Sequence, residues 1–296
     1  MAEGRFGLQL VDGSTPDIIL DELSGGRMKG RRDGEHVEIP VEDVLKMTPN
    51  TGEGVVAKSP AGHHAFFLPD GGFVMGELLP GAASKKTAVL AQIGIGQPVE
   101  MRFSALMGLR ISAIEVPDVE KSLQERLAEH QSGRDTMILV KDGKPIILQG
   151  SLEKLSATGW EFTFGDKTRS GDLSKVYAFV FGAPATPFPP SETMLHFIDG
   201  NRFGGSLIRA DRDALTIETQ FGGALEVPWN IVRKAEFQSA RVVYLSDLKP
   251  AQSEQRSLPG AMWPARMDSN VTGGPLRLGG RAFVRGGGAW LFVADL

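Results

Sequence analysis

The residues with the clearest chemical potential in this chain are its five histidines, because imidazoles are common ligands of zinc. Only His63 and His64 are neighbours, and the others are scattered: His36, His130 and His196. Adjacent side chains diverge on a regular strand or helix, so we expect this pair not to chelate an ion. The chain has no cysteine, which removes thiolate ligands and cysteine nucleophiles. The sequence therefore predicts no metal site.

Other motifs of catalysis or cofactor binding do not occur in the sequence. The Asp-Gly dipeptides never stand in the Asp-x-Asp-x-Asp-Gly spacing of a calcium loop. The glycines at 94 and 96 lack the Lys-Ser/Thr that completes a phosphate loop. Neither the Gly-x-Ser-x-Gly elbow of serine hydrolases nor the His-Glu-x-x-His motif of zincins is present. We therefore expect no cofactor, no catalytic residue and no enzymatic activity.

The Asp-Gly dipeptides instead mark an internal repeat. An apolar run followed by Asp-Gly occurs four times, at intervals of 58, 72 and 57 residues: LQLVDG at 8–13, FFLPDG at 66–71, MILVKDG at 137–143 and MLHFIDG at 194–200. Three copies are followed by a second shared phrase: VEIP at 37–40, VEMR at 99–102 and LEVP at 225–228. One supersecondary unit is therefore used repeatedly, which favours a binding surface over an enzyme.

Each copy has the pattern of about four or five short antiparallel strands. Asp-Gly suits a tight hairpin turn, and residues 215–219 alternate between apolar and polar, as a half-buried strand does. Glu38, Glu100 and Glu226 stand between apolar neighbours and should face solvent. This content fits either a small SH3/Sm-like barrel or one propeller blade, and the unequal intervals favour separate barrels. We expect an all-β fold of tandem small antiparallel barrels with one inserted helix.

That helix is predicted at about 117–130, where Pro117 and Asp118 supply a start signal. An apolar stripe on it should cover the edge of a neighbouring barrel: Val116, Val119, Leu123 and Leu127. Gly- and Pro-bearing segments at 48–59 and 184–190 are predicted connectors. The expected boundaries are 5–48, 64–113, 135–183 and 192–240 for the four repeats, 114–134 for the helical insert and 242–296 for a C-terminal part.

Composition is that of an ordinary folded chain, with 41% hydrophobic and 23% charged residues. The net charge of −4 gives no overall basic field, so nucleic acid is an unlikely partner. No apolar stretch reaches the length of about 18 residues that a membrane-spanning helix needs, so we expect no membrane span. Residues 1–6 lack the basic start of a signal peptide, so we expect none in the chain as given.

The C-terminal part carries two specific phrases: VVYLSDLKP at 242–250 and MDSNVTGGPLRLGGRAFVRG at 267–286. Together they resemble the opening of an NPCBM domain. This family of carbohydrate-binding modules has a β-sandwich fold and occurs attached to glycoside hydrolases and in envelope proteins of planctomycete-like bacteria. The upstream repeats are also similar to strand units that accompany such modules in planctomycete proteins.

The resemblance implies a non-catalytic binding or cell-envelope scaffold protein, periplasmic or extracellular, whose partner is a polysaccharide or a glycoprotein. Trp263, Trp290 and Tyr244 are the candidate carbohydrate-binding residues, because sugars bind on aromatic platforms. After Gly288 the family continues with a histidine and further strands, whereas this chain continues with AWLFVADL and stops. We therefore expect a truncated β-sandwich fragment with weak or absent carbohydrate binding.

A second function class comes from the fourth repeat. Its phrase FIDGNRFGGSL at 197–207 resembles the first half of an Sm motif. This resemblance implies a tandem SH3/Sm-like barrel protein that binds protein or RNA partners. The second half of the motif is lacking and the net charge is negative, and both observations count against RNA.

Overall fold

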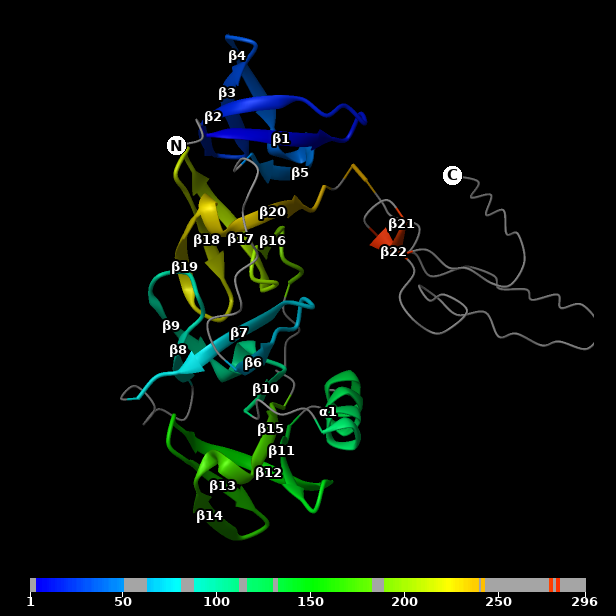
Figure 1. Cartoon of the computed structure of the whole chain (residues 1–296), viewed down its shortest axis with the longest axis vertical. Helices are drawn as coiled ribbons and strands as arrows, with labels where there is room; N and C mark the ends of the chain where they lie inside the picture. The colour runs from blue at the N-terminus through cyan, green and yellow to red at the C-terminus, as the bar shows by residue number, and fades with distance from the viewer. Residues whose placement is uncertain are drawn as a thin grey trace, which may run out of the picture. The chain divides into compact units, whose positions relative to one another are not determined.

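The structure, a computed structural model, describes residues 4–50, 63–80, 88–111, 116–129, 133–182, 189–239, 241–242, 277–278 and 281–282. This part of the chain is all-β, with 59% strand and one helix, as the sequence predicts (Figure 1). The chain divides into two units, Met1–Ser239 and Ala240–Leu296. In the second unit the structure describes a short antiparallel pair, β21 (Arg277–Leu278) and β22 (Arg281–Ala282). The other predicted sandwich strands lie outside the described residues.

The first unit contains four copies of one arrangement, five strands with a 3-10 turn between the fourth and the fifth. Repeat 1 consists of β1 (Arg5–Leu10), β2 (Asp17–Ser24), β3 (Arg27–Arg32), β4 (Glu35–Pro40), η1 (Val41–Asp43) and β5 (Val44–Pro49). Repeat 2 consists of β6 (His64–Phe67), β7 (Phe73–Leu78), β8 (Ala88–Gln92), β9 (Pro98–Arg102), η2 (Phe103–Ala105) and β10 (Gly108–Arg110).

The other two copies have the same order of elements. Repeat 3 consists of β11 (Asp135–Lys141), β12 (Lys144–Leu155), β13 (Trp160–Phe164), β14 (Lys167–Gly171), η3 (Leu173–Lys175) and β15 (Val176–Val180). Repeat 4 consists of β16 (Thr193–Phe197), β17 (Arg202–Ala210), β18 (Ala214–Thr219), β19 (Gly223–Pro228), η4 (Trp229–Ile231) and β20 (Val232–Phe237). The inserted helix α1 (Pro117–Glu129) lies between repeats 2 and 3 in the sequence.

Strand pairing inside each repeat follows one scheme. The first strand lies between the second and the fifth, and the third and fourth strands continue from the second in antiparallel order. Each repeat thus has the strand order of an SH3/Sm-like unit, fifth–first–second–third–fourth, and the predicted all-β fold class is confirmed. The predicted Asp-Gly turns join the first strand to the second. At Asp142 and Gly143 both φ angles are positive, 52° and 74°, as a two-residue type I′ turn requires.

A glycine in the second strand of three repeats lets that strand approach the third strand closely. A Cβ atom on Gly205 would lie 2.2 Å from the carbonyl oxygen of Glu218, and one on Gly150 would lie 1.9 Å from that of Thr163. Gly76 occupies the equivalent place in repeat 2. The Gly-x-Leu that follows Asp-Gly in these repeats is therefore a requirement of the backbone and does not indicate a ligand.

Repeats 1 and 4 complete one another's sheet. β5 pairs with β20, and β2 pairs with β17 through Ser24 and Arg209. Together with the pairs inside the two repeats, these contacts close a six-stranded antiparallel barrel with the order β1, β2, β17, β16, β20 and β5. The barrels are therefore joined, whereas the unequal intervals in the sequence favoured separate ones.

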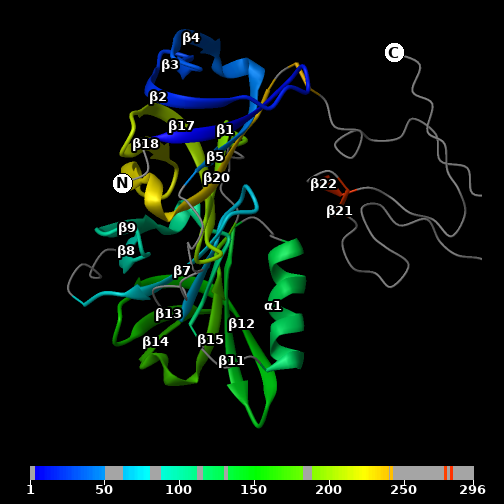
Figure 2. The same cartoon turned by 45° about the horizontal axis from the view of Figure 1, so that its top comes forward.

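Repeats 2 and 3 are joined in a similar way, through their fifth strands β10 and β15. Phe103 of repeat 2 stacks on Phe181, with ring centroids 5.0 Å apart and planes at 14°. The helix α1 lies against the sheet of repeat 3 (Figure 2). Its residues Val119, Leu123 and Leu127 are buried in a cluster with residues of β11 and β15, so the prediction that the stripe covers a barrel is confirmed.

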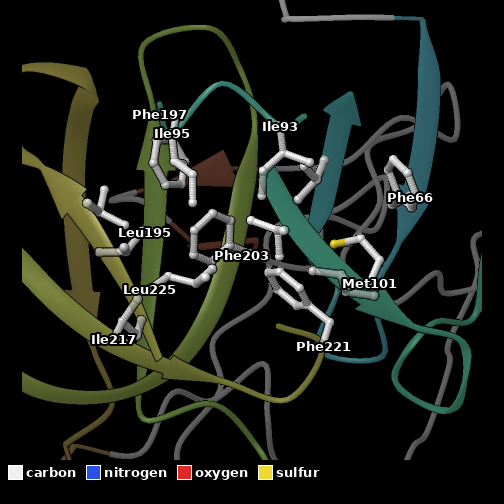
Figure 3. Packing of buried hydrophobic residues seen from close by; sticks show 14 of the residues in the cluster. Phe66, Ile93, Ile95, Met101, Leu195, Phe197, Phe203, Ile217, Phe221 and Leu225 are labelled. Carbon is white, nitrogen blue, oxygen red and sulfur yellow. The ribbon is translucent and has the colours of Figure 1, made fainter. Parts of the chain in front are cut away.

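Repeats 4 and 2 share a hydrophobic core (Figure 3). Phe203 and Phe221 of repeat 4 meet edge to face at 5.4 Å, and Met101 of repeat 2 belongs to the same cluster. The backbone N–H of Arg102 donates to the carbonyl of Phe221 at 3.1 Å. By these contacts the repeats follow the order 1–4–2–3, which differs from their order in the chain and can be followed in Figure 1.

Candidate functional site

The aromatic residues that the family resemblance suggests for carbohydrate binding, Tyr244, Trp263 and Trp290, lie outside the described residues. Their role as sugar platforms stays a prediction. His130 also lies outside them, and His36 is exposed on β4. Trp229 is 4% exposed and is part of the core.

His63, His64 and Glu77 come together at the beginning of the sheet of repeat 2. His63 Nδ1 lies 2.9 Å from Glu77 Oε1, and His64 Nδ1 lies 3.4 Å from Glu77 Oε2. The two imidazole rings are 4.1 Å apart. The expectation that the adjacent histidines diverge is wrong, because β6 begins only at His64 and its alternation does not apply to His63.

The three side chains differ in burial. His64 is only 6% exposed, whereas the side chains of His63 and Glu77 are 49% and 41% exposed. Burial lowers the pKa of His64, the neighbouring His63 lowers it further, and Glu77 opposes this effect in part. A neutral imidazole keeps the lone pair with which it accepts a hydrogen bond or binds a metal ion. The cluster is therefore a set of Lewis bases with one buried member and two accessible ones.

A second histidine–carboxylate pair lies in repeat 4. His196 Nε2 is 2.8 Å from Glu236 Oε2, and Lys234 Nζ is 2.5 Å from the other carboxylate oxygen. The hydrogen bond from His196, followed by that from Lys234, lowers the pKa of Glu236 to about 2, although burial opposes the shift. Because an ammonium group occupies one side of the carboxylate, this cluster is an ion-pair network on the sheet and is unsuited to a metal ion.

A third cluster fixes α1 to the sheet. The Tyr177 hydroxyl donates to Glu120 Oε2 at 2.7 Å, and Arg110 Nη1 lies 3.4 Å from the same oxygen. Burial, followed by the contact with Glu120, raises the pKa of Tyr177 to about 12. Burial alone would raise the pKa of Glu120, but the hydrogen bonds from Tyr177, Gln124 and Arg110 hold it below its ordinary value. This network is structural, since it connects the helix to β15 and β10.

Asn201, which connects repeats 4 and 2, is a residue that the sequence patterns did not single out. Its side chain is 3% exposed, accepts from the Met75 N–H at 2.7 Å and donates to the Met75 carbonyl at 3.3 Å. The Asn201 side chain thus makes the two backbone hydrogen bonds to Met75 of β7 that a neighbouring strand would otherwise make. Ser191 also donates to Asp70 at 2.7 Å across the same two repeats. The Asn that follows Asp-Gly in repeat 4 was the available signal, because the other copies lack it.

The three carboxylates between apolar neighbours are all exposed, as predicted. Glu38, Glu100 and Glu226 lie on the fourth strands of three different repeats. Glu38 pairs with Arg27 on the neighbouring β3 at 2.9 Å. Because each of these glutamates belongs to a different repeat, their placement does not indicate a shared ligand site.

A cavity of about 230 Å³ opens beside the C-terminal end of α1 and the sheet of repeat 3. Arg126, Arg134 and Gln149 are among the residues that line it, and Arg126 is held by Glu129 at 2.8 Å. The volume is below the range of about 300–1,000 Å³ that is typical of small-molecule sites. We therefore assign this cavity no ligand.

In the described part of the chain, no helix is both long enough and apolar enough to cross a membrane. A scan against protein-family models gives no match to this chain, and a search of the curated proteins gives none either.

Proposed function

We propose that this chain is a non-catalytic binding scaffold of the cell envelope. In this proposal the four joined barrels of the first unit are the scaffold, and the NPCBM-like residues 242–296 recognise a polysaccharide or a glycoprotein only weakly, as the sequence leads us to expect. Tyr244, Trp263 and Trp290 would provide the aromatic platforms for the sugar rings.

The joining of repeats 1 and 4 into one six-stranded barrel supports this proposal most strongly. The second and fifth strands pair between repeats. In the described residues β4, β14 and β19 each pair only with the third strand of their own repeat. β9 pairs with β8 and also donates the backbone hydrogen bond from Arg102 to Phe221 of repeat 4. A body with a continuous core and several accessible sheet edges is typical of a binding protein, since catalysis usually needs a concave pocket.

A polysaccharide pull-down or glycan array with the full chain tests the proposal. The comparison variants are Tyr244→Ala, Trp263→Ala and Trp290→Ala, with Trp160→Ala in repeat 3 as the control. Binding that the first three weaken and the control retains would support carbohydrate recognition by this segment. Binding to no polysaccharide, or binding that all three variants retain, would contradict it.

One observation favours a second candidate, the binding of a protein partner by the tandem barrels. All five residues of β14 are exposed, and the strand carries Lys167 and Arg169 on an edge that no further described strand pairs with. An extended acidic segment of a partner can add to such an edge as a further strand. Lys167→Glu combined with Arg169→Glu should abolish such binding. A gel-shift assay with RNA at increasing salt concentration tests the nucleic-acid version of this alternative.

A further inference from the structure

We propose that His63, His64 and Glu77 form a binding site for a divalent transition-metal ion, with Zn²⁺ as the ion that fits the donor set best. Two imidazoles and one carboxylate are an established zinc-binding combination. The proposal does not depend on the scaffold function proposed above.

The distances in the cluster suit a tetrahedral ion. The ligand atoms of the three side chains all lie within 4.8 Å of one another. In a tetrahedral zinc site with bonds of about 2.0–2.1 Å, ligand atoms are separated by about 3.4 Å. The two histidine–carboxylate separations, 2.9 and 3.4 Å, lie close to this value. Each histidine faces a different oxygen of Glu77, so small side-chain rotations are enough to admit an ion.

His64 Nδ1 has two polar neighbours, the Leu78 N–H at 3.4 Å and Glu77 Oε2 at 3.4 Å. Both distances are long for a hydrogen bond, so neither contact commits the ring nitrogen strongly, and an ion can compete with them for its lone pair. His64 is buried and serves as the fixed ligand, while the half-exposed His63 and Glu77 can close on the ion from solvent.

Comparison of repeats 2 and 4 shows that the barrel itself does not need these side chains. His64 is the cross-strand partner of Gly76, and Thr193 is the partner of Gly205 in the same way. The residue after each glycine is Glu77 in repeat 2 and Ser206 in repeat 4. The same backbone thus carries Thr and Ser where repeat 2 carries His and Glu, so a packing requirement does not account for the cluster.

The His196–Lys234–Glu236 cluster of repeat 4 differs from the repeat 2 cluster in the groups that contact its carboxylate. There, Glu236 is shared between one histidine and the ammonium group of Lys234, which cannot ligate a metal. In repeat 2 the second partner of the carboxylate is another imidazole. His196→Ala is therefore a matched control, since it removes a histidine of a histidine–glutamate pair that we do not expect to bind metal.

The experiment is a calorimetric titration of the chelator-treated full chain with ZnCl₂. Wild type should bind one Zn²⁺ at a site that His64→Thr and Glu77→Ser each weaken by about tenfold or more, while His196→Ala leaves it unchanged. The two substitutions introduce the residues of repeat 4, which the barrel accommodates. Glu77→Gln, a change at a half-exposed position, is a second variant should His64→Thr fail to fold.

A spectroscopic readout identifies the ligands independently of affinity. Co²⁺ in place of Zn²⁺ should give the intense visible absorption of a tetrahedral site, and Glu77→Ser should remove it. No saturable binding of Zn²⁺ by wild type would overturn the proposal. Binding of equal strength by wild type and both variants would also overturn it, because the ion would then be held elsewhere.

Discussion

Phe6 of repeat 1 packs edge to face against Trp229 of repeat 4, with ring centroids 4.8 Å apart and planes at 67°. Phe6 is 1% exposed and Trp229 is 4% exposed. The indole N–H of Trp229 also donates to the carbonyl of Asp211 at 2.8 Å. The first and last repeats therefore share a core inside their common six-stranded barrel. Removing either ring should thus destabilise both repeats.

Trp229→Ala should lower the free energy of unfolding by about 3–5 kcal/mol, because it leaves a large cavity and removes a buried hydrogen bond. Urea unfolding followed by circular dichroism measures this change. Trp160→Ala is the matched control, since the Trp160 indole N–H also donates to a backbone carbonyl at 2.8 Å but its ring is only partly buried. An equal loss in the two variants would contradict the shared core.

Gly205→Ala should destabilise the chain strongly, by about 2 kcal/mol or more, since its Cβ would overlap the carbonyl oxygen of Glu218. In Gly7→Ala, the nearest neighbour of the new Cβ is the side-chain oxygen of Asp17, at 3.3 Å. The effect there should be small, because that side chain can move. Thermal unfolding compares the two variants, and a similar melting temperature for both would show that the approach of the strands at Gly205 is not needed.

Tyr177→Phe should lower the stability by about 1.5–3 kcal/mol, because Glu120 loses a hydrogen bond to a charged group in a partly buried place. The folded-state pKa of Tyr177, about 12, is above the ordinary value of 10.0. Its contribution is therefore complete below pH 10 and is lost as the pH rises toward 12. Urea unfolding between these pH values should show a smaller alkaline loss in the Phe variant than in wild type.

Glu236→Gln should remove part of the acid sensitivity of the fold. The folded-state pKa of Glu236, about 2, is below the ordinary value of 4.5, so its contribution is present above pH 4.5 and is lost as the pH falls toward 2. Stability measured across this range should fall less steeply in the variant. Glu226→Gln, on the exposed face of β19, is the control and should leave the slope unchanged. Identical slopes in wild type and the Glu236 variant would refute the prediction.

The repeated unit could be predicted from sequence because its signals are local. The Asp-Gly turns, the alternation at 215–219 and the stripe on 117–129 each depend on neighbouring residues, and the structure agrees with all three. The pairing of Ser24 with Arg209 could not be predicted, because every repeat offers similar strand edges and nothing local selects repeat 4 as the partner of repeat 1. The convergence of His63 and His64 depended on where β6 begins, which the sequence does not determine to a single residue.

The most direct test of the joined barrels is a disulfide between Ser24→Cys and Arg209→Cys. These residues are antiparallel partners on β2 and β17, where Cα atoms are about 4.5–5.5 Å apart, within the range that a disulfide spans. The chain has no cysteine of its own, so the pair reports on this contact alone. Mild oxidation should give an intramolecular disulfide, detected by mass spectrometry of the digested monomer, whereas Ser24→Cys with Thr168→Cys in repeat 3 should not. Failure of the first pair to link within one chain would contradict the six-stranded barrel on which the scaffold is built.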